Sequence, residues 1–273
     1  MKRSLIIGGA ALVLAACAIG PTDAQKEELS KIHSVGVISL IGDQFHMVHV
    51  NFSVVDNRDK QYSVENWRVD EKTEALIKSL LERSGKFQTV WTGYPRTHLY
   101  SARSATYIDL DTEFKKLEPE LRAAISSRPV DALLVLTKRV GGDGIGQSSA
   151  SLEGIGLYSR AIGGNLGAVA AYASYEITVV DGSTLKPIVS EGGYVTQVDP
   201  ILRVPLYRYP FRSLHLSFSS LDFMNTEKRD IREWTTDFTK LTGDDEKTIK
   251  EALAQVLNAS IPDTLRGLSL ISQ

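Results

Sequence analysis

The apolar positions of this chain follow the period of a strand in some stretches and the period of a helix in others. Residues 33–41 form a β-branched run that predicts a strand. Residues 48–55 alternate between apolar and polar, which predicts a half-buried strand and a hairpin partner for the first. The continuous apolar run at 131–140 predicts a central strand. Alternation at 171–180 and a return strand at 186–198 predict a second hairpin.

Four stretches carry apolar residues at helical spacing, one of them the stripe of Ile231, Trp234, Phe238 and Leu241. Asp70 is placed to cap a helix that runs to Ser84, and residues 112–127 predict another helix. Asp244 is placed to cap a helix near the C-terminus, which Pro262 is expected to end or bend. The order of strands and helices predicts a mixed α/β fold, in which a mixed β-sheet is flanked by helices and followed by a C-terminal helical segment.

The first residues have the pattern of a bacterial secretory signal. Lys2 and Arg3 precede an uncharged, mostly apolar run that ends in Leu-Ala-Ala-Cys at residues 14–17. This run is shorter than the about 20 apolar residues that a transmembrane helix needs. Residues 1–16 are therefore expected to be a signal peptide that is absent from the mature protein.

The sequence Leu14-Ala15-Ala16-Cys17 resembles the lipobox of bacterial lipoproteins. The resemblance implies cleavage before Cys17 and a covalent acyl-glycerol lipid on its thiol. Because Ala18 rather than aspartate follows, it also implies an outer-membrane lipid anchor with the domain facing the periplasm. The alternative is an ordinary buried cysteine next to an ordinary signal peptide. Residues 17–30 are polar and are expected to form a lipidated tether, which leaves residues 31–273 as one periplasmic α/β domain.

A further resemblance rests on the order of elements. The strand pattern Val35-Val37-Ile38, the helix ending in Gly85-Lys86-Phe87 and the strand at 131–136 look like the CsgG/LpoB-like periplasmic lipoproteins. The likeness covers residues 32–198. It implies a two-layer or three-layer α/β domain and brings no catalytic motif. Members of that family secrete curli fibres, activate peptidoglycan synthases or have no assigned role.

Composition narrows the function classes. The chain has 273 residues, of which 42% are hydrophobic, and 31 basic residues nearly balance 33 acidic ones. A net charge of -2 argues against nucleic acid as a partner. Cys17 is the only cysteine, which excludes an internal disulfide. Residues 141–167 are rich in glycine, and the interpretation is a flexible or tightly folded loop inserted into the domain.

The search for catalytic or metal-binding patterns yields no candidate. His46 and His49 are three residues apart in a predicted strand, where such residues point to opposite faces. They are expected to be solvated or hydrogen-bonded rather than metal ligands, because a metal site needs three or four convergent groups. The sequence therefore predicts a protein that is not an enzyme and that takes no cofactor other than the lipid on Cys17.

One stretch mixes basic and aromatic side chains, a combination that is enriched at interfaces. It is a candidate contact surface for a partner or for anionic lipid, and the alternative is a loop whose aromatic rings pack on the core while its arginines stay hydrated. The candidate contact residues are Arg203, Tyr207, Arg208, Tyr209, Phe211 and Arg212.

Taken together, these patterns predict a membrane-anchored envelope lipoprotein that binds an envelope partner or supports envelope assembly. The alternative is a CsgG-like oligomer, a secretion or pore component that inserts the hairpin at 169–180 into the membrane, since a spanning strand needs about 9–11 residues. A homo-oligomer is thus one partner to consider. A hydrolase with an unrecognised site ranks last.

Overall fold

The computed structural model of the chain describes residues 20–50, 58–90, 93–94, 96–100, 103–104, 110–126, 128–142, 151–162, 165–193 and 242–272. In this part of the chain the strands are β1 (Ser34–Leu40), β2 (Gln44–Val50), β3 (Arg58–Ser63), β4 (Gln88–Val90), β5 (Arg103–Ser104), β6 (Ala132–Gly142), β7 (Ser151–Ile162), β8 (Asn165–Asp181) and β9 (Pro187–Gly193). The helices are α1 (Asp23–Ser30), the short 3-10 helix η2 (Glu65–Trp67), α2 (Val69–Ser84), α3 (Arg96–Leu99), α4 (Leu110–Ser126) and α7 (Gly243–Gly267).

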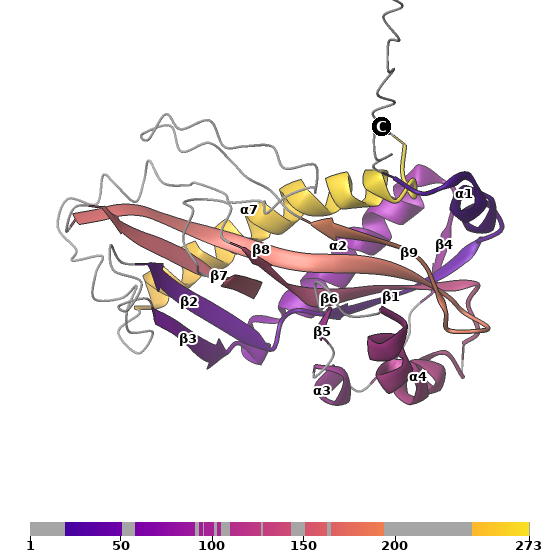
Figure 1. Cartoon of the computed structure of the whole chain (residues 1–273), viewed down its shortest axis with the longest axis horizontal. Helices are drawn as coiled ribbons and strands as arrows, with labels where there is room; N and C mark the ends of the chain where they lie inside the picture. Colours follow the sequence, from indigo (N-terminus) through magenta and orange to yellow (C-terminus); the bar gives the residue numbers. More distant parts are fainter. Residues whose placement is uncertain are drawn as a thin grey trace, which may run out of the picture.

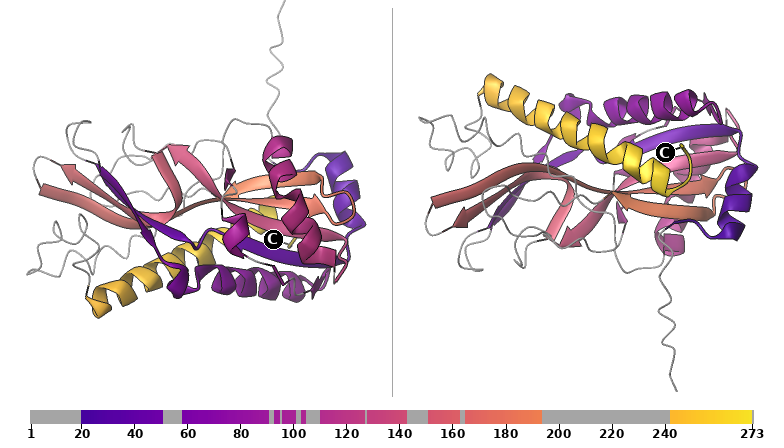
Figure 2. Two further views of the ribbon diagram at one scale, coloured as in Figure 1. Left: turned by 90° about the horizontal axis from the view of Figure 1, so that it is seen from below. Right: turned by 90° about the horizontal axis from the view of Figure 1, so that it is seen from above.

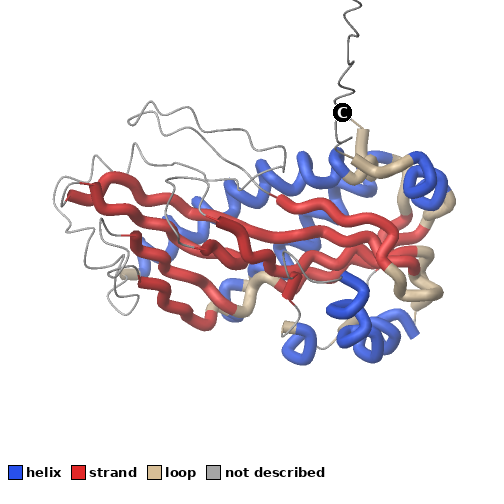
Figure 3. The backbone as a smooth tube through the Cα atoms, in the orientation of Figure 1, coloured by secondary structure: helices blue, strands red, loops and turns tan. Residues whose placement is uncertain are grey.

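The described strands form one nine-stranded mixed sheet, as Figures 1 and 3 show. Its main order is β3-β2-β7-β8-β6-β1-β4, with β5 beside β6 and β9 beside β8. Helices α2 and α7 lie along one face, and α3 and α4 lie against the other (Figures 1 and 2). The predicted mixed α/β fold with a C-terminal helix is confirmed.

The position of β6 between two layers of helices explains why its sequence is apolar without alternation. Ala132, Leu134 and Leu136 belong to the core beneath α2 and α7, whereas Leu133 and Val135 belong to the core beneath α4. Both faces of the strand are therefore buried, as its continuous apolar run predicts.

The predicted hairpin between the first two strands is wrong. The first segment is β1 and residues 48–50 of the second lie in β2, whereas residues 51–55 lie outside the described residues. β1 pairs in parallel with β4 on one edge and with β6 on the other. β2 pairs antiparallel with β3 and in parallel with β7. Because both edges of each strand are occupied by other partners, the link at residues 41–43 carries the chain from one half of the sheet to the other.

The described residues of the glycine-rich stretch 141–167 belong to strands and not to a loop. Residues 151–162 form β7, which lies between β2 and β8. Gly154 has a φ of 60°, and a Cβ there would lie 3.2 Å from the Cγ of Lys138. A Cβ at Gly156 would lie 2.3 Å from the carbonyl oxygen of His46. These glycines let neighbouring backbones and side chains approach closely, so the loop interpretation is wrong for the described residues.

The second predicted hairpin is confirmed as β8 and β9. The turn between them is closed by Asp181, whose Oδ1 accepts hydrogen bonds from the amides of Ser183 and Thr184 at 3.0 and 2.6 Å. Residues 171–180 are all buried within the sheet. The side chains of these ten residues are therefore enclosed by the domain.

The predicted tether is shorter than expected. Residues 23–30 form α1, with a capping box between Thr22 and Gln25. The Gln25 side chain donates to the carbonyl of Ile188 in β9 at 2.8 Å, and Leu29 is buried in the main core. Residues 20–30 therefore belong to the folded domain, and the interpretation of this part as a tether is wrong.

Helix α7 has a different N-cap from the one predicted, and Pro262 does not end it. Thr242 is its N-cap and forms a capping box with Asp245, whereas Asp244 lies in the first turn. Pro262 lies inside the helix, which continues to Gly267. The C-terminus lies at the same end of the sheet as α1 (Figure 1). None of the helices among the described residues is long and apolar enough to cross a membrane.

Candidate functional site

The residues that the sequence singles out for contact with lipid or a partner lie outside the described part of the chain. This holds for Cys17 and for the basic-aromatic stretch from Arg203 to Arg212. The candidate site below is therefore built from residues that the sequence did not single out for binding.

His46 has a local partner, as the sequence predicts. Its side chain is buried, and its Nδ1 lies 3.2 Å from the carboxylate of Asp59 on the neighbouring strand β3. Among the described residues, no group of three histidine, cysteine, aspartate or glutamate side chains is placed to hold a metal ion.

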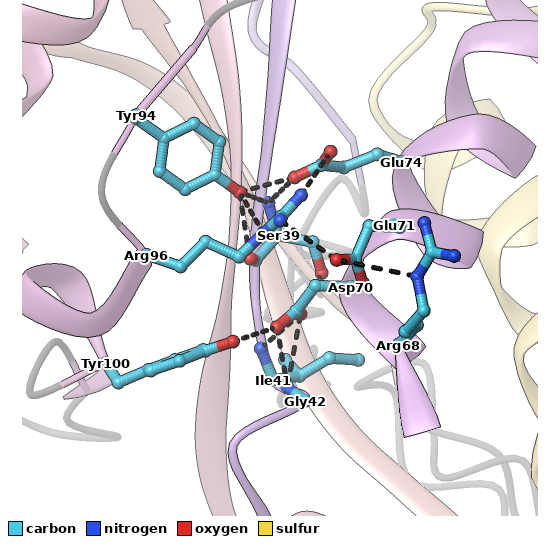
Figure 4. A network of polar contacts seen from close by, with 10 residues as sticks. All are labelled: Ser39, Ile41, Gly42, Arg68, Asp70, Glu71, Glu74, Tyr94, Arg96 and Tyr100. Carbon is cyan, nitrogen blue, oxygen red and sulfur yellow. Dashed lines mark hydrogen bonds and ion pairs between the residues drawn. The ribbon is translucent and has the colours of Figure 1, made fainter. Parts of the chain in front are cut away.

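The strongest buried polar cluster is centred on Asp70, in the first turn of α2 (Figure 4). Its side chain is 2% exposed. Oδ1 accepts hydrogen bonds from the Ser39 hydroxyl at 2.7 Å and from the Ile41 and Gly42 amides at 2.9 and 3.1 Å. Oδ2 accepts from the Tyr100 hydroxyl at 2.9 Å. Asp70 thus holds the β1–β2 link against α2 and the segment that carries α3.

The predicted role of Asp70 as a helix cap is wrong. Arg68 is the N-cap of α2, with a φ of 55° and no side-chain cap bond. The Asp70 carboxylate bonds instead to β1, to the link that follows it and to Tyr100. Asp70 therefore stabilises contacts between elements that are distant in the sequence, and not the start of its own helix.

Glu74, one turn further along α2, extends the same network (Figure 4). It accepts hydrogen bonds from the Ser39 amide at 3.1 Å, from the Tyr94 hydroxyl and from Arg96 Nη2 at 2.9 Å. Arg96 Nη1 also lies 3.2 Å from Glu71. The arginine therefore balances two carboxylates of α2 from the opposite side of the network.

Burial dominates the electrostatics of this network. It raises the pKa of Asp70 to about 6, although the hydrogen bonds from Ser39, Ile41 and Tyr100 act in the opposite direction. Burial and the neighbouring carboxylates also raise the pKa of Tyr94 and Tyr100 above the ordinary range. The oxygens of Asp70 accept hydrogen bonds from four donors, so this carboxylate acts as a structural tie between β1, the β1–β2 link and Tyr100.

A second feature is open to solvent: a groove between α2 and α7. Its volume is about 160 Å³. Its lining is mainly apolar, with two lysines and an asparagine, and consists of Trp67, Val69, Lys72, Thr73, Leu76, Lys250, Leu253, Ala254, Leu257 and Asn258. We refer to this feature as the α2–α7 groove.

Helix geometry explains how the groove forms. Lys250, Ala254 and Asn258 are spaced four residues apart, so they form one ridge along α7. Val69 and Leu76 line the opposite side from α2. Ala254, which has a small side chain, lies between Lys250 and Asn258 on this ridge. The four-residue spacing in the sequence predicts that these residues share one face of a helix. It does not show whether another element packs on that face, because this depends on the tertiary fold.

Two lysines lie at the groove rim, and one of them is already paired with a carboxylate. Lys250 lies 5.1 Å from the centre of the Trp67 ring and forms an ion pair with Glu246. Lys72 is exposed and has no anionic partner among the described residues. The lining contains no acidic side chain. The arrangement is suited to binding an apolar group that has a negative charge next to Lys72.

Comparisons with known proteins give no close relative. No protein-family model matches the chain, and no curated protein matches it. Among solved structures, the PelC dodecamer from Paraburkholderia phytofirmans is 8% identical, with 86% of each chain covered and a TM-score of 0.28. A DUF330 protein from Xanthomonas campestris is 10% identical, with 86% of this chain and 85% of that chain covered and a TM-score of 0.33. Neither similarity is close enough to transfer a function.

Proposed function

We propose that this protein is a lipid-anchored lipoprotein of the bacterial cell envelope whose α/β domain binds an envelope partner and catalyses no reaction. The α2–α7 groove is the observation that carries the proposal, because it is an apolar surface with a positive rim that no described residue covers. The largest polar network of the described residues, in contrast, is occupied by its own hydrogen bonds.

The anchor follows from the lipobox-like residues. Cys17 would carry the acyl-glycerol, and two or three acyl chains hold a protein firmly to a bilayer. The stretch from Cys17 to Thr22 reaches at most ~18 Å when extended. Because α1 packs on β9 and the core, this short stretch would hold the domain close to the membrane, with the α1 end nearest. The proposed location is the periplasmic side of the outer membrane.

Lipid attachment is tested with Cys17→Ala in intact cells fed a palmitate analogue. The wild-type protein is expected to take up the label and to fractionate with the outer membrane. The variant is expected to remain an unlabelled precursor. Label retained by the variant would show that the lipobox interpretation is wrong.

Partner binding is tested by photo-crosslinking in the same cells. A photoreactive phenylalanine analogue at Ala254, inside the groove, is expected to give a discrete crosslinked species. The same analogue at Ala259, which is exposed on α7 but outside the groove lining, is the matched control. Equal crosslinking from both positions would contradict a specific partner at the groove. A native mass of the detergent-extracted protein separates a second copy of this chain, or a CsgG-like ring, from a different partner.

A further inference from the structure

The size and charge of the α2–α7 groove indicate which kind of partner it accepts. We propose that the groove binds an acidic protein segment, which inserts one aromatic or large aliphatic side chain between the helices and places a carboxylate beside Lys72. This inference rests on the proposed function as a partner-binding protein and specifies the chemistry of the partner.

The volume of the groove favours a single side chain over a larger ligand. A cavity of about 150 Å³ holds one benzene molecule, whereas sites for drug-sized ligands have about 300–1,000 Å³. At about 160 Å³ the groove can take one ring or one leucine-sized group. It has no room for a whole acyl chain or a cofactor. Protein interfaces commonly place one such anchor residue in a pocket of this size.

The lining supports an apolar anchor at the bottom of the groove. Leu253 and Leu257 are buried residues of α7 and also belong to the core, so the floor is rigid. Leu76 is partly buried and packs against the same core from α2. Trp67 closes one end, where its ring contacts Phe45 at a centroid distance of 5.2 Å. An inserted side chain would meet apolar surface on both helices.

The lysines at the groove rim determine which charge on a partner is favoured. The lining contains Lys72 and Lys250 and no acidic side chain, and because Lys250 is already paired with Glu246, Lys72 is the lysine available to a partner. A carboxylate next to the anchor can therefore pair with Lys72, which has no anionic partner among the residues that the structure describes. A basic segment would meet like charges instead. Complementary charge of this kind determines specificity and association rate more than affinity.

The test uses the full-length lipoprotein in nanodiscs and a displayed library of random twelve-residue peptides. Peptides are selected on the wild-type protein and counter-selected on Ala254→Trp, which fills the groove from an exposed position. Enriched peptides are expected to carry an aromatic residue or leucine with Asp or Glu within four residues. Binding of the synthetic peptides is expected to weaken at least tenfold with Ala254→Trp and severalfold with Lys72→Glu.

Two matched variants control for general effects. Ala259→Trp adds the same ring at an exposed position of α7, and Lys86→Glu makes the same charge reversal at an exposed position outside the lining. Both are expected to bind the peptides as the wild type does. If Ala254→Trp does not fold, as judged by its thermal melt, Ala254→Leu replaces it and is expected to weaken binding in the same direction.

Three outcomes would overturn the proposal. Enriched peptides that depend on Ala254 but are basic or uncharged would leave the groove as a binding site and reject an acidic partner. Binding of palmitate in the groove, without enrichment of acidic peptides, would assign it to lipid. Enrichment of no peptide that depends on Ala254 would reject the groove as a docking site. The crosslinking experiment in cells judges the proposed function separately from all three.

Discussion

Replacing Asp70 with alanine tests whether this carboxylate holds the β1–β2 link or merely supports the start of α2. Three of its donors, the Ser39 hydroxyl and the Ile41 and Gly42 amides, lie in buried residues and would lose their acceptor. Each buried donor left unsatisfied costs about 1–3 kcal/mol. The expected loss of stability for Asp70→Ala is therefore at least about 3 kcal/mol, compared with about 1 kcal/mol for a lost helix cap.

The pKa of Asp70 adds a pH dependence with a defined sign. Its pKa is raised in the folded protein to about 6, from 3.8 as the ordinary value. Between these two values the folded state binds more protons than the unfolded state, so the contribution of Asp70 to stability falls as pH rises. Asp70→Asn removes this titration. The stability of Asp70→Asn relative to wild type is expected to rise by about 2 kcal/mol from pH 4 to pH 6 and to level off above pH 7, where the total effect of the raised pKa is about 3 kcal/mol, since one pKa unit corresponds to about 1.4 kcal/mol.

Both expectations can be measured by urea unfolding of the chain from Ala18 onward at several pH values. Asp244→Ala is the matched control, because Asp244 is exposed and also lies in the first turn of a helix. It is expected to change the stability by less than about 1 kcal/mol. A loss of about 1 kcal/mol for Asp70→Ala would refute the structural tie. A difference between Asp70→Asn and wild type that does not vary from pH 4 to pH 7 would refute the raised pKa.

Two other changes probe the packing of the sheet and of α1. Lys138 is 2% exposed, and its Nζ lies 2.6 Å from Oδ2 of Asp43. Lys138→Met leaves this carboxylate unpaired, so it should lower the free energy of unfolding by about 3–5 kcal/mol in chemical denaturation. Adding Asp43→Asn should restore part of the loss. Leu29→Ala should cost about 2–5 kcal/mol by thermal unfolding and should expose α1 to limited proteolysis, whereas resistance equal to wild type would show that α1 does not depend on this contact.

The sequence predicted most strands and helices because burial leaves a local pattern. β6 and α7 are recognisable from their own apolar spacing. The partner of a strand leaves no such pattern. Nothing in residues 34–50 shows that β1 pairs with residues 132–137 rather than with β2, because the competing edges come from distant parts of the chain.

The same limit applies to individual side chains. Asp70 has the position of a helix cap in the sequence, and only the fold brings Ser39 and Tyr100 to its oxygens. Gly154 and Gly156 resemble loop residues until Lys138 and His46 are placed beside them. The α2–α7 groove was missed for a related reason, since it forms between two helices far apart in the sequence, and neither helix alone shows which part of its surface stays uncovered.

The length of β8 has a consequence for how this domain forms. Residues 165–174 of β8 pair with β7, while residues 175–181 pair with β6 and residues 175–180 with β9. β1 and β2 emerge first during synthesis, but Val35 pairs with Ala132 and Phe45 with Ile155. Such distant pairings delay the closing of the sheet, because the loop entropy is lost before the contacts form. β2 can pair with β3 soon after both emerge, but β1 lacks β6 until residue 137 has been made, and the sheet is completed only when β8 has joined β6, β7 and β9. Apolar strand edges of the nascent chain therefore stay open until late in its synthesis, which favours aggregation at that stage.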